Sequence, residues 1–240
     1  MGVRLFAPIA LAATVVGVST PAVAERIESP INWQFEIKMG PYKASIDDEF
    51  GGAASPFTDI YGSSDVLMGL VEVDYQFWRG VGSLAVGGTI GYALDNGTAI
   101  IQGTETKSND ETSFNVVPMQ LSLNYHFDYL DVKFGVPLVP FFKIGLDYWV
   151  WWFRDSAGDT PKFGGGEGSG GTFGWHWSAG LKINLDWIDN DSAVAIDNEF
   201  GVNNSYLFGE FMWADVDDFG SSSSLRAGDH TFFFGLAFEL

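Results

Sequence analysis

The sequence contains no cysteine, which excludes a disulfide framework, thiolate chemistry and lipid attachment through a cysteine. Beyond residue 24 it also lacks any apolar run long enough to cross a membrane as a helix. Basic residues are scarce, with 12 Lys and Arg against 31 Asp and Glu and a net charge of −19. Because the phosphates of nucleic acid attract positive charge, we predict no nucleic-acid partner for so acidic a chain.

The first residues carry the features of a secretory signal. Arg4 precedes an apolar run over Leu5–Val18, and the small residues Ala22–Ala24 follow it. A basic start, a short apolar core and an Ala-x-Ala ending predict cleavage after residue 24. We therefore assign residues 1–24 to a signal peptide and expect residues 25–240 to form one domain.

Large apolar side chains alternate with small or polar ones along Thr172–Trp187. Every odd-numbered residue from Phe173 to Trp187 is apolar, and no even-numbered residue between them carries a large apolar group. A period of two places the two sets on opposite faces of a β-strand. Tilted by about 40°, such a strand rises about 35 Å, which is enough to cross the apolar band of a membrane barrel and its interfaces.

Seven more segments alternate in the same way, and the central positions of one face carry no charge. They are Trp33–Tyr42, Val66–Trp78, Ser83–Leu94, Phe114–Phe127, Phe141–Trp152, Ser205–Trp213 and Thr231–Leu240. In lipid, only helices and closed barrels satisfy their backbone hydrogen bonds. We therefore predict an all-β fold, a transmembrane antiparallel up-and-down β-barrel of eight strands. Ten strands are the alternative if a long loop contains a hairpin.

The predicted connections alternate between long polar loops and short turns. Long loops follow the first, third, fifth and seventh strands, and short turns at Arg79–Gly82 and Asp128–Asp131 follow the second and fourth. The connection Ile188–Asn204 is longer and predicts a short helix near Ser192–Phe200. If the N-terminus lies in the periplasm, all the long loops lie outside the cell. The outer end of the fifth strand predicts an aromatic girdle, formed by Trp149, Trp151, Trp152 and Phe153.

The inward faces of the predicted strands carry charged residues. One interpretation is a network of ion pairs that fills the interior, since eight strands leave room for little more than side chains. The other is a narrow path for cations, since carboxylates outnumber lysines and the small inward residues of Ser83–Ala93 leave space on one side. The candidate lumen network comprises Glu36, Lys38, Glu72, Asp74, Lys143, Asp147, His176, Lys182, Asp186 and Glu210.

Three histidines are the candidates for catalysis, and the predicted strands hold them apart. His126 lies at the inner end of its strand, His176 lies near the outer end of another, and His230 faces the interface. Acid–base partners and metal ligands must converge within a few ångströms. We therefore predict no catalytic group, metal or cofactor. The acidic runs Asp47–Glu49 and Asp215–Asp218 match no complete calcium loop, so we interpret them as solvated loops.

Three stretches resemble known outer-membrane proteins. Phe232–Leu240 resembles the C-terminal signal that assembly machinery reads in small outer-membrane barrels, with Leu240 in place of the usual Phe. Val136–Tyr148 and Asn198–Glu210 resemble a group of outer-membrane β-barrel proteins found in myxobacteria and their relatives. The resemblance implies a bacterial outer-membrane barrel and brings no activity or catalytic residue with it.

The sequence thus predicts a non-enzymatic outer-membrane protein with a structural or surface-interaction role and a lumen largely filled by side chains. Its expected partners are outer-membrane lipids, lipopolysaccharide and, during insertion, the barrel-assembly machinery. A narrow pore for cations or small apolar solutes is one alternative. An outer-membrane lipid-modifying enzyme that acts through His126 or His176 is a second. The sequence leaves the oligomeric state open.

Overall fold

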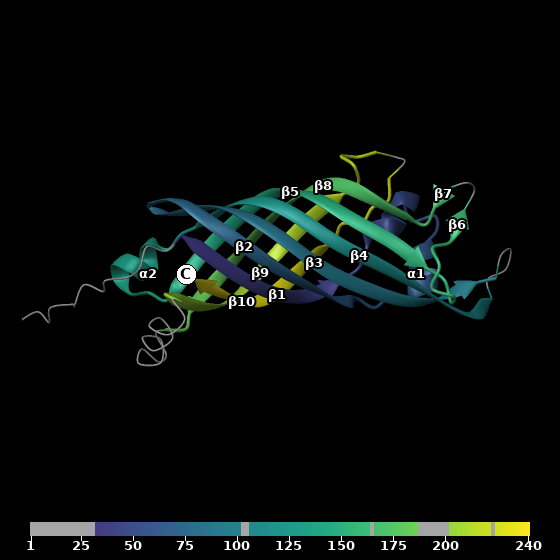
Figure 1. The fold of residues 1–240 in the computed structure, drawn as a ribbon, viewed down its shortest axis with the longest axis horizontal. Helices are drawn as coiled ribbons and strands as arrows, with labels where there is room; N and C mark the ends of the chain where they lie inside the picture. Colours follow the sequence, from purple (N-terminus) through teal and green to yellow (C-terminus); the bar gives the residue numbers. More distant parts are fainter. Residues whose placement is uncertain (1–31, 102–105, 164–165, 187–201, 222–223) are drawn as a thin grey trace, which may run out of the picture.

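A computed structural model describes most of the chain as one long barrel (Figure 1). The predicted signal peptide and the predicted helix near Ser192–Phe200 lie outside the described residues, so both stay expectations. The described residues are 32–101, 106–163, 166–186, 202–221 and 224–240.

Eight antiparallel strands close into a barrel in the order β1-β10-β9-β8-β5-β4-β3-β2. Closure joins the first strand to the last, with Gln34 opposite Glu239 and Met39 opposite Phe234. The predicted eight-stranded barrel is therefore confirmed, and the barrel has no free edge. The strands are β1 (Trp33–Tyr42), β2 (Val66–Gly80), β3 (Gly82–Ile100), β4 (Lys107–His126), β5 (Leu138–Arg154), β8 (Ser169–Asn184), β9 (Asn204–Val216) and β10 (His230–Glu239).

Two further short strands form a hairpin that does not join the barrel. β6 (Lys162–Phe163) pairs only with β7 (Gly166–Glu167), in the connection between β5 and β8. A long loop therefore does contain a hairpin, as the ten-stranded alternative required, yet the barrel keeps eight strands. β3 and β4 also run further than predicted, with Ile100 opposite Lys107.

The connections distinguish the two ends of the barrel. The connections that begin after β1, β3, β5 and β9 lie at one end, which we call the loop end; β6, β7, η1 (Ser45–Phe50) and α1 (Pro56–Tyr61) belong to it. Because β3 and β4 extend so far, the connection between them is shorter than predicted and spans only residues 101–106. The opposite end, which we call the turn end, carries α2 (Tyr129–Phe134) and the C-terminus (Figure 1). α2 replaces the predicted simple turn. No helix in the described part of the chain is long and apolar enough to span a membrane.

The outer wall of the barrel is an apolar belt. Outward side chains such as Ile37, Ile90 and Leu121 are exposed, while their neighbours along each strand are buried. Between the two rims, the outward positions of these eight described strands carry no Asp, Glu, Lys or Arg. A Lys or Arg facing the bilayer midplane would cost about 2–4 kcal/mol. This exterior suits hydrocarbon rather than water, so the barrel is a membrane-spanning one.

Candidate functional site

The inward side chains fill the barrel in three layers. An apolar layer at the loop end, which we call the mouth plug, comprises Tyr42, Ala44, Ile46, Phe57, Met68, Leu70, Ala93, Phe114, Val116, Trp149, Met212, Ala214, Val216, Ala227 and Phe233. A middle layer of paired charges, which we call the charge network, comprises Glu36, Lys38, Glu72, Lys143, Lys182 and Glu210. An apolar layer nearer the turn end, which we call the lower cluster, comprises Val139, Phe141, Tyr206, Phe208 and Ala237.

Trp149 belongs to the mouth plug, and the predicted girdle is wrong at this position. It is 0% exposed, because it shares the inward parity of Lys143 and Asp147 on β5. Its indole Nε1 donates a hydrogen bond to Asp147 Oδ1 at 2.9 Å, and its ring centroid lies 5.9 Å from that of Tyr42. Trp151 and Phe153 also pack against the plug while partly buried. The aromatic end of β5 therefore helps to close the lumen.

The connection between β1 and β2 folds over the mouth of the barrel. Ile46 of η1 and Phe57 of α1 are both buried in the mouth plug. The ring of Phe57 stacks on that of Tyr61 at 4.6 Å and meets Phe114 edge-on at 5.4 Å. η1 and α1 thus form a cap over the barrel mouth. The hydroxyl of Tyr42, at the end of β1, donates a hydrogen bond to the carbonyl of Ala227 at 2.8 Å, which attaches the β9–β10 connection to the same end of the barrel.

Asp47 fixes α1 within this cap. Its carboxylate accepts hydrogen bonds from the backbone N–H of Phe57 at 2.8 Å, from that of Thr58 at 3.0 Å and from Thr58 Oγ1 at 2.6 Å. Partial burial acts to raise the pKa of Asp47, but the hydrogen bonds from Thr58 and Phe57, together with nearby Lys43, outweigh it and lower the pKa from its usual value. The first residue of the predicted solvated acidic run is thus a structural cap.

The charge network pairs each of its lysines with glutamates from other strands. Lys143 Nζ lies 2.6 Å from Glu36 Oε2 and 2.8 Å from Glu72 Oε1. Lys38 Nζ lies 2.8 Å from Glu72 Oε2 and 2.6 Å from Glu210 Oε1. Lys182 Nζ completes the network at 2.9 Å from Glu36 Oε1. All of these side chains are buried, so the attraction is little screened by water or salt.

Neighbouring polar groups extend the network towards β3. Asn124 donates to Glu72 Oε1 at 3.0 Å and to Asp74 Oδ1 at 2.9 Å. The space predicted along the small inward residues of β3 is filled by these groups and by Leu70. A Cβ on Gly87 would lie 2.2 Å from Asp74 Oδ1, and one on Gly91 would lie 2.3 Å from Leu70 Cδ2. Glycines on β3 therefore admit side chains from β2 and β4.

Asp147 anchors a second polar group beneath the mouth plug. Its carboxylate lies 2.7 Å from His176 Nδ1 and accepts hydrogen bonds from Gln120 Nε2 at 2.6 Å and from Trp149 Nε1 at 2.9 Å. The carboxylate is thus surrounded by donors. This group links the aromatic plug to the polar interior, and its side chains are buried.

The structure brings most of the predicted lumen residues together, in two groups. Six of them form the charge network, and Asp74 adjoins it by accepting from Asn124. Asp147 and His176 form the separate pair described above. Asp186 lies apart: it follows the last residue of β8, is only half-buried, and its Oδ1 accepts from the backbone N–H of Ser205 at 3.3 Å. The reason is that β8 ends two residues before Asp186, so strand parity no longer directs this side chain.

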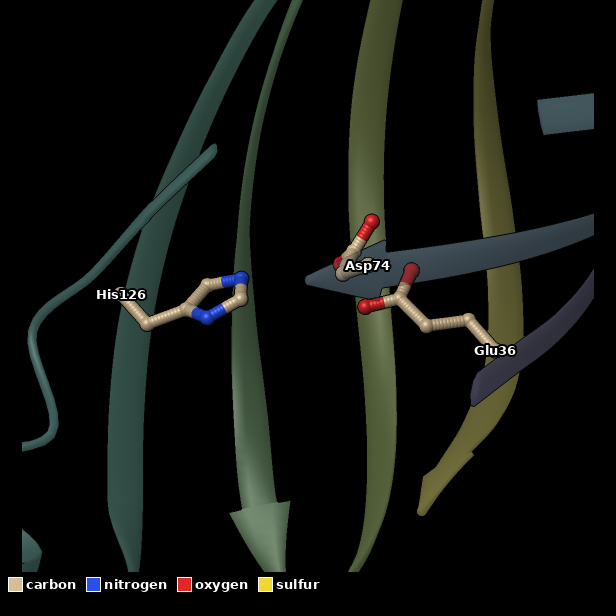
Figure 2. Close-up of side chains that lie close together, drawn as sticks. All are labelled: Glu36, Asp74 and His126. Carbon is tan, nitrogen blue, oxygen red and sulfur yellow. The ribbon is translucent and has the colours of Figure 1, made fainter. Parts of the chain in front are cut away.

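Glu36, Asp74 and His126 form the one set of at least three potential metal-ligating groups within the described residues (Figure 2). One ligand atom from each lies within 4.8 Å of the others. A positive charge already occupies this place, because Lys182 Nζ lies 2.9 Å from Glu36 Oε1 and 3.4 Å from His126 Nε2. Two carboxylates and an imidazole suit a divalent cation as ligands. The ammonium, however, neutralises the same carboxylate that an ion would need.

Several residues that complete the interior were not among the predicted ones. Gln34, Gln120 and Asn124 donate hydrogen bonds to the buried carboxylates. Their inward parity is visible in the sequence, but a prediction restricted to ionisable residues does not include them. Tyr206 and Phe208 share the parity of Glu210 and lie inward with it, so the inward face of β9 mixes apolar and charged side chains.

Neither a known protein family nor a curated protein matches the sequence. Solved structures of small eight-stranded outer-membrane barrels are similar to it. Neisserial surface protein A aligns at a TM-score of 0.48 and 12% identity over 88% of this chain and 98% of that one. Ail of Yersinia pestis, solved with the heparin analogue sucrose octasulfate, aligns at 0.42 and 10% over 88% and 100%. The N-terminal β-barrel domain of Pseudomonas aeruginosa OprF aligns at 0.38 and 12% over 88% and 98%.

Proposed function

We propose that the chain is an integral protein of the bacterial outer membrane, with a closed lumen and a structural or surface-interaction role. The observation that carries this proposal is the filling of the interior by the mouth plug, the charge network and the lower cluster. An eight-stranded barrel has an interior just wide enough for side chains, and here they occupy it. Membership in the group of myxobacterial barrels is part of the same proposal.

A cation path is disfavoured because lysines already neutralise the carboxylates. A permeating ion would have to displace the ammonium groups of Lys38, Lys143 or Lys182 from contacts of 2.6–2.9 Å. It would also have to pass the mouth plug, where Trp149 is fully buried. Apolar solutes meet the opposite obstacle, since the charge network lies between the two apolar layers.

An enzymatic role in lipid modification is disfavoured by where the histidines lie. His126 and His176 are both buried inside the barrel, whereas the lipid lies against the outer wall. A general base must come within hydrogen-bond reach of the proton that it removes. The side chain that does reach the outer rim, His230, packs against Trp213 with ring centroids 4.4 Å apart and the two ring planes tilted.

The surface role is assigned to the loop end. Long loops of outer-membrane barrels lie outside the cell, and the described parts of the loops of this chain are acidic. The exposed acidic residues there include Asp48, Glu49, Asp110, Glu111, Asp155 and Asp159. Such a surface attracts cationic groups and repels phosphate, so we propose that lipopolysaccharide contacts it through bridging cations rather than directly. The barrel-assembly machinery is the proposed partner during insertion.

Single-channel recording in planar bilayers tests the closed lumen. The purified full chain should give no conductance steps above those of a bare bilayer, because all three interior layers obstruct the path. A general porin inserted by the same procedure is the control for insertion, and a boiling-dependent shift in gel mobility verifies that the barrel is folded. Reproducible conductance steps from the folded chain would overturn the closed-lumen proposal in favour of a pore.

A further inference from the structure

A groove of about 300 Å³ lies on the outer wall of the barrel, where β4, β5 and β8 run side by side. Its volume is at the lower end of the range for small-molecule pockets. The outward side chains around it are apolar, and the aromatic pair Tyr148 and Phe173 has ring centroids 4.6 Å apart. Its apolar lining comprises Met119, Leu121, Leu146, Tyr148, Phe173 and Phe219.

The polar side chains at the groove floor are turned to the lumen. Gln120 Nε2 donates to Asp147 Oδ1, and Asp147 Oδ2 contacts His176. Gly174, opposite Asp147 in the β5–β8 register, adds no side chain. The groove therefore presents hydrocarbon and aromatic surface to an occupant and offers it no free charge.

A strained turn places Phe219 at the edge of the groove. Asp218, Phe219 and Gly220 all have positive φ, at 54°, 58° and 86°. For a bulky residue such as Phe this conformation is an outlier, and it persists only where the surroundings enforce it. Two hydrogen bonds do so: Asp218 N–H donates to the carbonyl of Phe173 at 2.8 Å, and Phe173 N–H donates to Asp218 Oδ1 at 2.7 Å.

Burial of the Phe219 side chain does not compensate for this strained backbone conformation. Phe219 is 65% exposed, so it is not held by burial in the core. Its place beside Phe173 extends the groove wall from the barrel into the β9–β10 connection. A residue held in an unfavourable conformation, with a large apolar side chain exposed beside an apolar groove, points to an occupant that covers it.

We propose that this groove binds an acyl chain of a lipid in the outer leaflet of the membrane. The groove is continuous with the apolar belt and lies in its loop-end half, where Phe173 is four residues from the first residue of β8. Acyl chains are the apolar chains present at that depth, and the uncharged lining suits them. This proposal rests on the membrane location given above, and it adds a specific lipid site to it.

Native mass spectrometry of the full chain, extracted from membranes in detergent, tests the site. The wild-type chain should retain about one lipid molecule. Leu146→Trp fills the groove, and Phe219→Ala removes its upper wall; each should lower the retained fraction about tenfold, the factor expected when one large apolar side chain no longer buries against the ligand. The matched control is Leu207→Trp, the same substitution on the outward face of β9, which should retain lipid as the wild type does.

The outcomes separate the lipid site from the barrel itself. A folded barrel is verified for each protein by the boiling-dependent gel shift. Absence of that shift in the wild-type chain counts against the membrane-barrel proposal and not against the groove. With the shift intact, equal retention by all four proteins overturns the lipid site. Retention of detergent alone, of a free fatty acid or of a second copy of the chain overturns it as well. Loss from Leu146→Trp and Phe219→Ala alone supports it.

Discussion

At the scale of single residues, Lys143 has the most consequential contacts in the lumen. Its ammonium lies within 2.8 Å of two glutamates and 3.9 Å from Glu210 Oε2. A buried ion pair adds little net stability over an apolar substitute, because both charges lose their hydration. Removing one member of it is different, since the partners are left buried and uncompensated.

Lys143→Met should therefore lower the free energy of unfolding by about 3–5 kcal/mol, as expected for breaking a buried ion pair. Urea unfolding in detergent, followed by tryptophan fluorescence, measures the change. Lys162→Met is the matched control, because Lys162 pairs with Glu167 at 3.6 Å on the exposed β6–β7 hairpin. That change should cost about 0–1 kcal/mol. Similar losses for both variants would contradict the assigned role of Lys143.

Asp47 gives the cap over the barrel mouth a dependence on pH. Its pKa is lowered in the folded chain, because hydrogen bonds from Thr58 and Phe57 outweigh the effect of burial. A lowered pKa stabilises the folded cap above the unfolded value of about 3.9, and this stabilisation is lost as the pH falls through the folded pKa. Hydrogen exchange in α1 should therefore accelerate relative to the β-strands on acidification through that range.

The variant Asp47→Asn isolates this carboxylate. Asn keeps one acceptor oxygen but cannot titrate, so the variant should weaken the cap at neutral pH by less than the roughly 0.5–2 kcal/mol expected for replacement by Ala, and should remove much of the acid dependence of exchange in α1. Asp48→Asn is the control, since the neighbouring Asp48 is exposed. An unchanged acid response in Asp47→Asn would show that another group governs the cap.

The residue scale also shows where sequence reasoning succeeded and where it stopped. Strand parity predicted that Lys143 and Glu36 point inward, because alternation is a local property. It did not identify Glu36 as the partner of Lys143, since the two residues are 107 positions apart in the chain. Such pairings depend on barrel closure and register. The same alternation, applied consistently, would have placed Trp149 inward.

At the scale of elements, β3 shows how two adjacent glycines differ in importance. A Cβ on Gly87 would meet Asp74, Asn124 and Ser122 at 2.2–2.9 Å, whereas a Cβ on Gly88 would have nothing within 4 Å. Gly87→Ala should therefore destabilise the barrel by about 1–3 kcal/mol through overpacking. Gly88→Ala, on the lipid side, should be nearly neutral. Equilibrium unfolding of the two variants measures the difference, and equal stability would refute the close packing at Gly87.

Strand boundaries were predicted correctly only where the strand and its apolar alternation coincide: β8, predicted over Thr172–Trp187, in fact spans Ser169–Asn184. The predicted β1 has the same limits as the observed strand, Trp33–Tyr42, since apolar alternation runs along its whole length. β3 and β4 extend past their predicted ends towards the loop end. Outside the bilayer, a hairpin needs no apolar face, so alternation fades while pairing continues. α2 was missed because six residues are too few to show a helical period.

At the scale of the whole molecule, barrel closure follows from the strand count and from the connections. An even number of alternating strands leaves few arrangements in a membrane. The sequence did not predict that η1 and α1 close the mouth of the barrel. The cap of η1 and α1 depends on contacts such as Tyr42 with Ala227 and Phe57 with Phe114, which join segments far apart in the chain.

The distribution of the charge network among the strands constrains the order in which the protein enters the bilayer. The β5–β8 hairpin contributes the lysines Lys143 and Lys182, while Glu36, Glu72 and Glu210 come from β1, β2 and β9. Lys38 of β1 is the one lysine among those three strands in the network, so it leaves their carboxylates in excess. Either group alone would carry unpaired charge into hydrocarbon, at several kcal/mol for each ion. We therefore expect the strands to enter the membrane together, as a curved sheet whose two halves already face one another. The ion pairs then form before β1 pairs with β10 and closes the barrel.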